Sequence, residues 1–369
     1  MTRRSIDMAE VLDRLNTAAA AIDRTVTLME ICGTHTVAAF RCGLHSLMPQ
    51  NVRLLSGPGC PVCVTSQSDI DMMVALGSLE GVIVCTYGDM IRVPGATGSL
   101  ETARSQGAQV RVVYSAMDAV QFAAEHRDRQ VVFAAVGFET TTPATAAAVV
   151  EADRRKLDNF TILTSHKLVV PAIKALLDGG DVSLDGFLCP GHVSVIIGAE
   201  AYRPIVHEYH MRCVIAGFET LGMAAGLTRL TEQVRDGQVL LENMYPQAVT
   251  SEGNRVAQEL IARVFEPATV AWRALGEIPE SGLVLRPQYH QFDAQRRFNL
   301  AAPDSPDPEG CLCGQVITGR ATPHDCGLFG TACTPIHPIG PCMVSFEGTC
   351  QAWFKYRRPA EPASAGGRS

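Results

Sequence analysis

The chain carries a pair of cysteines in a turn built from glycine and proline, in the segment Gly57-Pro58-Gly59-Cys60-Pro61-Val62-Cys63-Val64-Thr65. Two thiols separated by two residues can close into a disulfide or grip one soft metal ion between them. Residues 52–55 read as a short strand, and the apolar spacing in residues 69–79 indicates a helix. The pair is therefore predicted in a strand-to-helix loop near the positive end of a helix dipole, where a thiolate is favoured. Buried, inert cysteines are the alternative, but cysteines between Gly and Pro in a loop seldom serve core packing.

A third cysteine, Cys32, follows a strand predicted over residues 25–31 and precedes a helix that runs through Leu44. Gly33 permits the tight turn between the two elements. This order places Cys32 and His35 at the carboxyl end of a strand, where open α/β sheets gather their ligands. We expect Cys32 to be held there as a thiolate, with His35 close by.

Four further cysteines lie in a loop-rich segment near the C-terminus, with six, eight and seven residues between successive members: Cys326, Cys333, Cys342 and Cys350. A segment rich in Gly and Pro and without apolar periodicity needs a cross-link to become ordered. Four thiolates on one centre would supply it, either around a [4Fe–4S] cluster or around a structural zinc. Zinc ligands usually come in Cys-x-x-Cys pairs, so the unpaired spacing favours the cluster without excluding zinc. Cys311 and Cys313 lie just upstream, and Cys313 is the reserve ligand.

Strands and helices alternate along most of the chain, which predicts parallel sheets covered by helices on both faces. Strands are expected at residues 25–31, 52–55, 81–85, 110–114, 131–136, 160–163, 186–188 and 213–216. No Gly-x-Gly-x-x-Gly stands between a strand and a helix, and no phosphate-binding loop ending in Gly-Lys-Ser/Thr is found. The fold class is therefore α/β, with Rossmann-like lobes that lack a nucleotide motif.

The tetrapeptide Gly-Phe-Glu-Thr occurs twice, at residues 137–140 and 217–220, each time after a predicted strand. We therefore expect two similar three-layer lobes facing each other across a cleft, with Glu139 and Glu219 on opposite sides of it. The alternative for either carboxylate is to satisfy backbone N–H groups at a helix N-terminus.

The predicted boundaries follow from these patterns. They are an N-terminal helix over residues 1–24, a first lobe over 25–150, a second lobe over 151–243, a helical and iron–sulfur lobe over 244–356, and a tail over 357–369. Residues 240–274 read as helical, and residues 301–310 as a Pro/Asp-rich linker.

Length and composition describe a folded protein of several domains. The chain has 369 residues, 47% of them hydrophobic, and a formal net charge of −7, which argues against nucleic acid or an anionic membrane as the partner. No apolar run is long enough to cross a bilayer, and the N-terminus is not a signal peptide. We therefore expect a cytoplasmic protein, in which 13 cysteines serve metal binding or thiol redox chemistry rather than structural disulfides.

Taken together, the Cys32 to Thr36 segment, the Gly57 to Thr65 segment, both Gly-Phe-Glu-Thr copies and the run from Cys342 to Cys350 resemble the HypD family of [NiFe]-hydrogenase maturation factors. The resemblance extends over about residues 29–356. It implies a protein that, with the small chaperone HypC, carries the iron that becomes the Fe(CN)2CO group of the hydrogenase, with cyanide coming from the HypE–HypF pair. It also implies a [4Fe–4S] cluster rather than zinc, and we expect the free chain to be monomeric.

The resemblance further implies the roles of individual residues. Cys32 would hold the iron together with a HypC thiol, with His35 beside it, and Cys60 and Cys63 would be a redox-active pair near the cluster. Cys326, Cys333, Cys342 and Cys350 would be the cluster ligands. Phe346, Thr349 and the extra Cys311 depart from the expected pattern; the first two put no ligand in doubt, whereas Cys311 leaves the role of the upstream thiols open.

Two other functions remain compatible with the residues. One is an iron–sulfur thiol–disulfide oxidoreductase that acts on a generic partner disulfide. The other is a structural adaptor that binds zinc.

Overall fold

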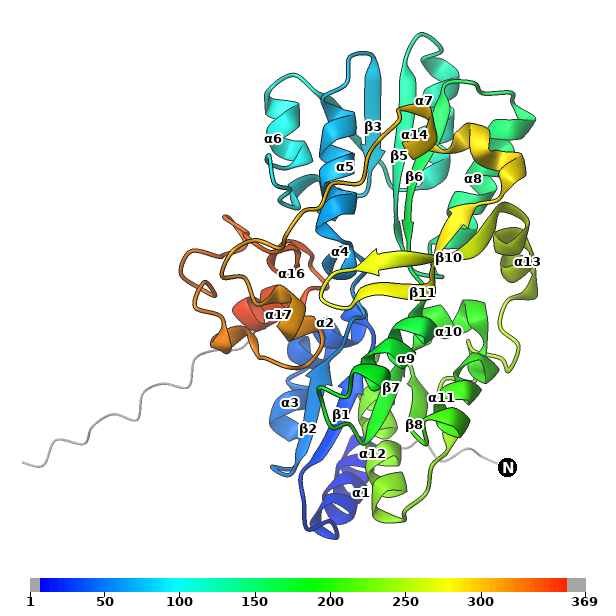
Figure 1. Ribbon diagram of the computed structural model, residues 1–369. Helices are drawn as coiled ribbons and strands as arrows, with labels where there is room; N and C mark the ends of the chain where they lie inside the picture. Colours follow the sequence, from blue (N-terminus) through cyan, green and yellow to red (C-terminus); the bar gives the residue numbers. More distant parts are fainter. Residues whose placement is uncertain (1–6, 357–369) are drawn as a thin grey trace, which may run out of the picture.

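The computed structural model describes residues 7–356, which form two parallel β-sheets, one antiparallel hairpin and a compact C-terminal segment (Figure 1). The five-stranded sheet has the order β2-β1-β7-β8-β9, and the four-stranded sheet has the order β4-β3-β5-β6. The five-stranded sheet consists of β1 (Val26–Glu30), β2 (Val52–Ser56), β7 (Gly186–Pro190), β8 (Arg212–Ala216) and β9 (Leu241–Asn243). The four-stranded sheet consists of β3 (Val82–Thr86), β4 (Gln109–Val112), β5 (Gln130–Gly137) and β6 (Phe160–His166). Every pairing within the two sheets is parallel, as the sequence predicted.

Helices cover both faces of the sheets. Alternate residues of β5 show this: Val131, Phe133 and Ala135 pack in one apolar core, and Val132, Ala134 and Val136 pack in another. A strand that is buried on both faces belongs to a three-layer arrangement. The helices of these layers are α1 (Met8–Ala20), α2 (Gly33–Arg41), α3 (Leu44–Leu47), α5 (Gln67–Gly77), α6 (Leu100–Ser105), α7 (Ala116–Glu125), α8 (Thr142–Arg154), α9 (Val169–Gly179), α10 (Gly191–Ile197), α11 (Arg203–Glu208) and α12 (Thr220–Arg235), with 3-10 turns at Gly88–Arg92 and Ala199–Tyr202.

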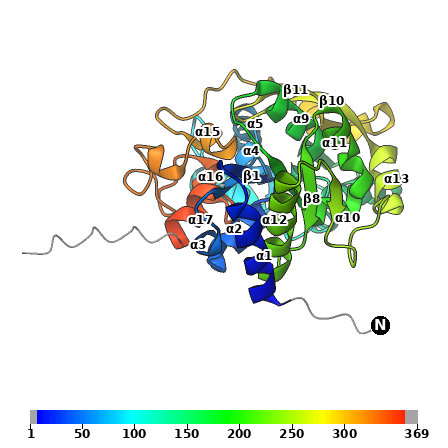
Figure 2. The same ribbon diagram turned by 90° about the horizontal axis from the view of Figure 1, so that it is seen from below.

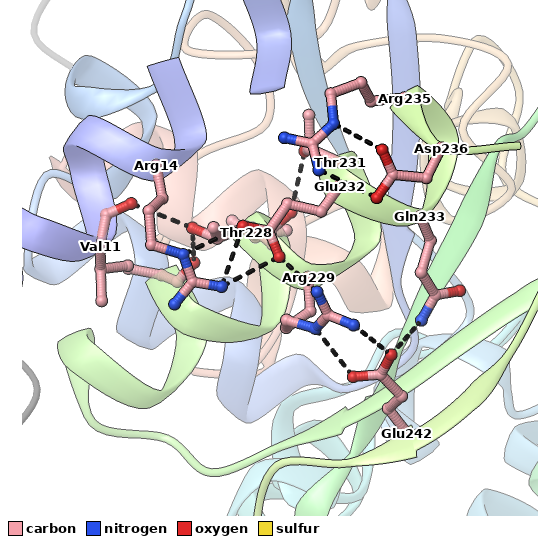
Figure 3. A network of polar contacts seen from close by, with 12 residues as sticks. Val11, Arg14, Thr228, Arg229, Thr231, Glu232, Gln233, Arg235, Asp236 and Glu242 are labelled. Carbon is pink, nitrogen blue, oxygen red and sulfur yellow. Dashed lines mark hydrogen bonds and ion pairs between the residues drawn. The ribbon is translucent and has the colours of Figure 1, made fainter. Parts of the chain in front are cut away.

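Helix α1, the described part of the predicted N-terminal helix, is tied to α12 by a polar network (Figure 3). Arg14 of α1 forms a bidentate ion pair with Glu232, at 3.0 and 2.9 Å, and Glu232 is also paired with Arg229. Arg229 continues to Glu242 of β9, and Gln233 donates to the same carboxylate at 3.2 Å. Two guanidinium groups thus compensate the buried Glu232 carboxylate.

The two sheets do not follow the predicted boundary at residue 150. The chain makes β1 and β2, crosses to build the four-stranded sheet from β3 to β6, and returns to add β7, β8 and β9 beside β1. Each lobe of the predicted division therefore contributes strands to both sheets. The two Gly-Phe-Glu-Thr segments nevertheless follow strands of different sheets, β5 and β8.

The prediction that residues 240–274 are helical is wrong for most of this segment. Only α13 (Arg255–Val264) is a helix of more than one turn there, and it passes directly into β10 (Phe265–Trp272), which pairs with β11 (Gly276–Leu285) as an antiparallel hairpin. Figure 1 shows this hairpin crossing between the two sheets. The 3-10 turn at Pro287–Phe292 and α14 (Ala294–Arg297) follow it.

The C-terminal segment begins after residues 301–310, which form neither helix nor strand, in agreement with the predicted linker. It consists of short elements joined by turns: α15 (Cys313–Ile317), a 3-10 turn at Pro323–Asp325, α16 (Pro341–Val344) and α17 (Thr349–Tyr356). Helices α15 and α16 pack against α4 (Pro61–Val64), which lies outside the segment. In the views of Figures 1 and 2 this segment lies to one side of β1 and α4. The predicted tail at residues 357–369 lies outside the described residues. Between residues 7 and 356 no helix is both long and apolar enough to cross a membrane.

Candidate thiol and metal site

The turn that carries Cys32 lies directly against the turn that carries Cys60. Cys32 is the last residue before α2, and the N–H of Gly33 donates to the carbonyl of Gly59 at 2.9 Å. A Cβ atom added to Gly59 would collide with the backbone of Cys32. The glycine therefore permits the close approach of two cysteine-bearing turns that are about 30 residues apart in sequence.

Cys32 lines a cleft of about 380 Å³ to which the two sheets and the C-terminal segment all contribute. The loops after strands β1, β3, β5 and β7 and the turn Ser345 to Glu347 form its walls, together with Pro61 and Val62 of the Cys60–Cys63 turn. Its polar lining includes Thr34, Tyr87, Asp89, Thr140, Thr141, His192, Ser345 and Glu347. A cleft of this size at the carboxyl ends of parallel strands is suited to a small ligand.

Two carboxyl groups hold the Cys32 turn. Glu30 accepts a hydrogen bond from the N–H of Cys32 at 2.8 Å and another from the hydroxyl of Thr36. Glu347 accepts from the Thr34 hydroxyl at 2.6 Å, which ties the C-terminal segment to α2. Sequence reasoning did not single out either residue, although a glutamate within the otherwise apolar strand β1 was a usable signal.

Burial sets the protonation of this turn. It raises the pKa of Cys32 to about 12, with the charge of Glu347 acting in the same direction. Burial also raises the pKa of Glu30 to about 8, against the hydrogen bonds that it accepts. The metal-free Cys32 side chain is therefore a thiol at neutral pH and not the expected thiolate. A soft metal ion has to displace its proton on binding.

His35 acts in a different way from the predicted one. Its Nε2–H donates to the carbonyl of Gly217 at 3.0 Å, and its ring packs on Phe218 at 4.7 Å between centroids. Burial lowers its pKa to about 4, so the imidazole is neutral at pH 7. It is not among the residues that line the cleft, and its link to Cys32 is a hydrogen bond from its backbone N–H. The imidazole thus anchors α2 to the loop after β8.

Cys60 and Cys63 form a disulfide, with their Cα atoms 5.2 Å apart. Cys60 is the N-cap residue of α4 and Cys63 lies within this helix, and Ser66 caps α5 by accepting from the N–H of Asp69. Both cysteines are buried, at 5% and 0% exposed. The sequence allowed either a disulfide or a pair of thiolates that binds a metal. The structure has the disulfide, which leaves no thiolate for a metal.

The C-terminal cysteines line one apolar cavity, and the cavity contains six of them rather than four: Cys311, Cys313, Cys326, Cys333, Cys342 and Cys350. The backbone N–H of Cys350 donates to the sulfur of Cys342 at 3.1 Å. Cys313 begins α15 and Cys342 lies on α16, and both helices pack against α4. The disulfide turn therefore lies between the cleft of Cys32 and this cavity.

Within residues 7–356, no group of three or more His, Cys, Asp or Glu side chains has the spacing of a site for one metal ion. The same segment nevertheless places six thiols around one cavity. The two observations are compatible, because the four ligands of an iron–sulfur cube bind separate iron atoms and stand farther apart than ligands that share one ion.

The two glutamates of the repeated tetrapeptide do not face the cleft, in contrast to the prediction. Glu139 turns into the core, where one carboxylate oxygen accepts from the N–H of Val169 at 3.0 Å, and burial raises its pKa to about 7. It therefore satisfies the first turn of α9, which was the alternative interpretation. Glu219 is exposed.

The fold and these thiols define a two-sheet α/β protein whose disulfide turn packs against a thiol-lined cavity. A family model named HypD, described as the hydrogenase formation hypA family, matches residues 7–357. The chain is 45% identical over 350 residues to the "Hydrogenase maturation factor HypD" of Azotobacter vinelandii, which covers 93% of this chain and 92% of that protein. It is 44% identical over 342 residues to the protein of the same name in Escherichia coli, with 92% of each chain covered. It is 41% identical over 349 residues to a putative hydrogenase expression/formation protein of Methanocaldococcus jannaschii, with 95% and 97% covered.

The chain therefore belongs to the HypD family of hydrogenase maturation factors.

Proposed function

We propose that this chain holds iron at Cys32 during hydrogenase maturation and that, with a HypC-like chaperone, it assembles or carries the Fe(CN)2CO group. The observation that carries the proposal is the position of Cys32, a lone thiol on the wall of a cleft that it shares with the disulfide turn. Iron that binds cyanide and carbon monoxide is soft, and thiolates are the ligands that suit it. The thiol of the chaperone would complete the iron site from the open side of the cleft.

The six-thiol cavity fits a [4Fe–4S] cluster in its donor chemistry and in its apolar lining. The cluster supplies single electrons when it is bound, and the Cys60–Cys63 pair would exchange two electrons between disulfide and dithiol. We propose Cys326, Cys333, Cys342 and Cys350, which line this cavity, as its ligands. Cys313 is the reserve ligand, and Cys311 lines the same cavity.

Serine substitution tests this ligand set. Cys342→Ser should lower the iron and acid-labile sulfide content to near zero and remove the visible absorption of the cluster, whereas Cys311→Ser should keep all three. Loss in Cys311→Ser together with retention in Cys342→Ser would replace Cys342 by Cys311 in the ligand set.

Replacement of Cys32 tests the iron-holding role. Cys32→Ala, purified with its chaperone, should lose the infrared bands of iron-bound cyanide and carbon monoxide while its cluster remains. Cys42→Ala is the matched control, because Cys42 is a free thiol at the opposite end of the same helix. Bands of wild-type intensity in Cys32→Ala would rule out this role.

The proposal also includes the cellular setting: a cytoplasmic protein, monomeric when free, that receives cyanide from HypE. Co-purification with both partners from a cytoplasmic extract, and a mass by light scattering that corresponds to one chain, would be the expected results.

The thiol–disulfide oxidoreductase is the second candidate, and the Cys60–Cys63 disulfide supports it. Both sulfurs are buried, however, so a folded partner cannot reach them unless the turn opens. Reduction of insulin by the isolated chain at the rate of a thioredoxin would favour this candidate. Metal analysis that finds zinc instead of iron would favour the structural adaptor.

A further inference from the structure

The tip of the β10–β11 hairpin packs against both the disulfide turn and helix α15 of the cysteine cavity. The backbone N–H of Arg273 donates to the carbonyl of Val64 at 2.9 Å, just after Cys63, and Trp272 forms a β-bridge with Thr65. On the other side, a Cβ atom added to Gly314 would collide with Ala274, so α15 packs directly on the hairpin tip. The hairpin thus contacts the two segments that carry the disulfide and the cavity cysteines.

Arg273 places a positive charge at this junction. Its side chain is fully buried at 0% exposed and donates to the carbonyl of Thr65 at 3.2 Å and to the side chain of Gln67 at 3.1 Å. Its counter-ion, Asp307, belongs to the linker before Cys311 and is 43% exposed. The guanidinium group therefore holds the turn that follows Cys63 to the linker that leads into the cavity.

A buried cation in this position serves more than packing. The guanidinium group binds the carbonyl of Thr65, two residues after Cys63, and its burial keeps its charge from being screened by solvent. A nearby positive charge stabilises thiolates, and hence the reduced form of a thiol pair. An exposed salt bridge at the surface would have little such effect, because solvent screens it.

We propose that Arg273 is a positioning residue for electron transfer between the cysteine cavity and the Cys60–Cys63 pair. It keeps the disulfide turn against α15, and its charge favours the dithiol. The inference rests on the proposed redox role of this pair.

The test is the equilibrium of Cys60 and Cys63 with a glutathione buffer, in which two glutathione thiols reduce the disulfide and one glutathione disulfide forms. The full-length protein is equilibrated at pH 7 and at pH 9, trapped by alkylation and read by mass spectrometry of the peptide that contains both cysteines. Arg273→Gln should lower the equilibrium constant for reduction about tenfold at pH 9, equivalent to about 30 mV. The loss should be smaller at pH 7, where fewer thiols are ionised. Arg273→Lys, which keeps the charge, should stay within about threefold of the wild type.

Asp307→Asn provides an independent variant that leaves the buried arginine in place. Because it removes the counter-ion, it should move the equilibrium in the opposite direction, towards the dithiol. Arg229→Gln is the matched control, since it deletes an ion-paired arginine of the α12 network and should have no effect on the thiols (Figure 3).

Equal shifts in Arg273→Gln and Arg273→Lys, or no shift in Arg273→Gln and Asp307→Asn, would overturn the inference. If Arg273→Gln does not fold, the direction of the shift in Asp307→Asn decides. A wild-type pair that never forms the dithiol would instead contradict the proposed redox function itself.

Discussion

Buried carboxyl and thiol groups determine the chemistry that individual residues can perform. Burial beside Glu347 raises the pKa of Cys32, so its side chain is a protonated thiol at neutral pH. Glu30 holds the backbone of Cys32 by accepting a hydrogen bond from its N–H. The sequence predicted that Cys32 and the Cys60–Cys63 pair lie on separate turns that follow strands, and the structure places these two turns side by side. The sequence could not assign Glu30, Glu347 or Arg273, because their roles depend on contacts between residues far apart in the chain.

Glu139 gives a prediction about pH. Its pKa is raised from 4.5 to about 7, so the folded state binds a proton that the unfolded state has released. This stabilisation is fully present below about pH 4.5 and is lost as the pH rises through 7. Glu139→Gln resembles the protonated form, and it should gain about 2–3 kcal/mol relative to the wild type between pH 5 and pH 8.

Urea unfolding at the two pH values measures this difference. Glu219→Gln, in the exposed second copy of the tetrapeptide, is the control and should follow the wild type at both. Parallel pH profiles for the wild type and Glu139→Gln would contradict the assignment.

At the scale of elements, most helices and strands of both sheets were predictable from apolar runs bounded by glycine and proline. The β10–β11 hairpin was not. Helix α13 ends at Val264 and β10 starts at Phe265 with no residue between them, and the nearest proline, Pro267, lies inside the strand rather than at its start. The element that joins the two thiol groups was therefore the one that local patterns could not reveal.

Trp272 fixes the hairpin in place. It donates from its indole N–H to Ser281 at 2.8 Å and stacks on Phe138 of the loop after β5. Trp272→Ala should lower the free energy of unfolding by about 3–5 kcal/mol, and it should speed hydrogen exchange at the amide of Arg273, which is bonded to Val64. Val256→Ala, at an exposed position of α13, should change neither quantity. An unchanged exchange rate at Arg273 in Trp272→Ala would show that the tip is held by other contacts.

For the whole molecule, the sequence predicted two parallel-sheet lobes and a cysteine-rich segment, and the structure confirms the two sheets. The sequence could not predict which strand joins which sheet, because local patterns do not specify the partners of a strand. The chain leaves the five-stranded sheet after β2 and returns to it at β7. The chain therefore crosses twice between the two sheets whose strand ends line the cleft.

This topology makes the predicted first lobe an incomplete unit. A fragment of residues 25–150 contains β1 and β5 but lacks β7 and β6, each of which is one of the two neighbours of β1 and β5 respectively. It should show no cooperative thermal transition by circular dichroism, whereas the full chain should. A cooperative transition in the fragment would mean that the sheets are less interdependent than their strand order indicates.

The central claim is that iron occupies two separate places, the six-thiol cavity and the cleft at Cys32. Anomalous diffraction at the iron absorption edge, from crystals of the anaerobically purified complex with the chaperone, tests it most directly. We expect one strong peak among Cys326, Cys333, Cys342 and Cys350 and a second, single-iron peak next to Cys32. A map without iron in the cavity, or with the second iron away from Cys32, would contradict it.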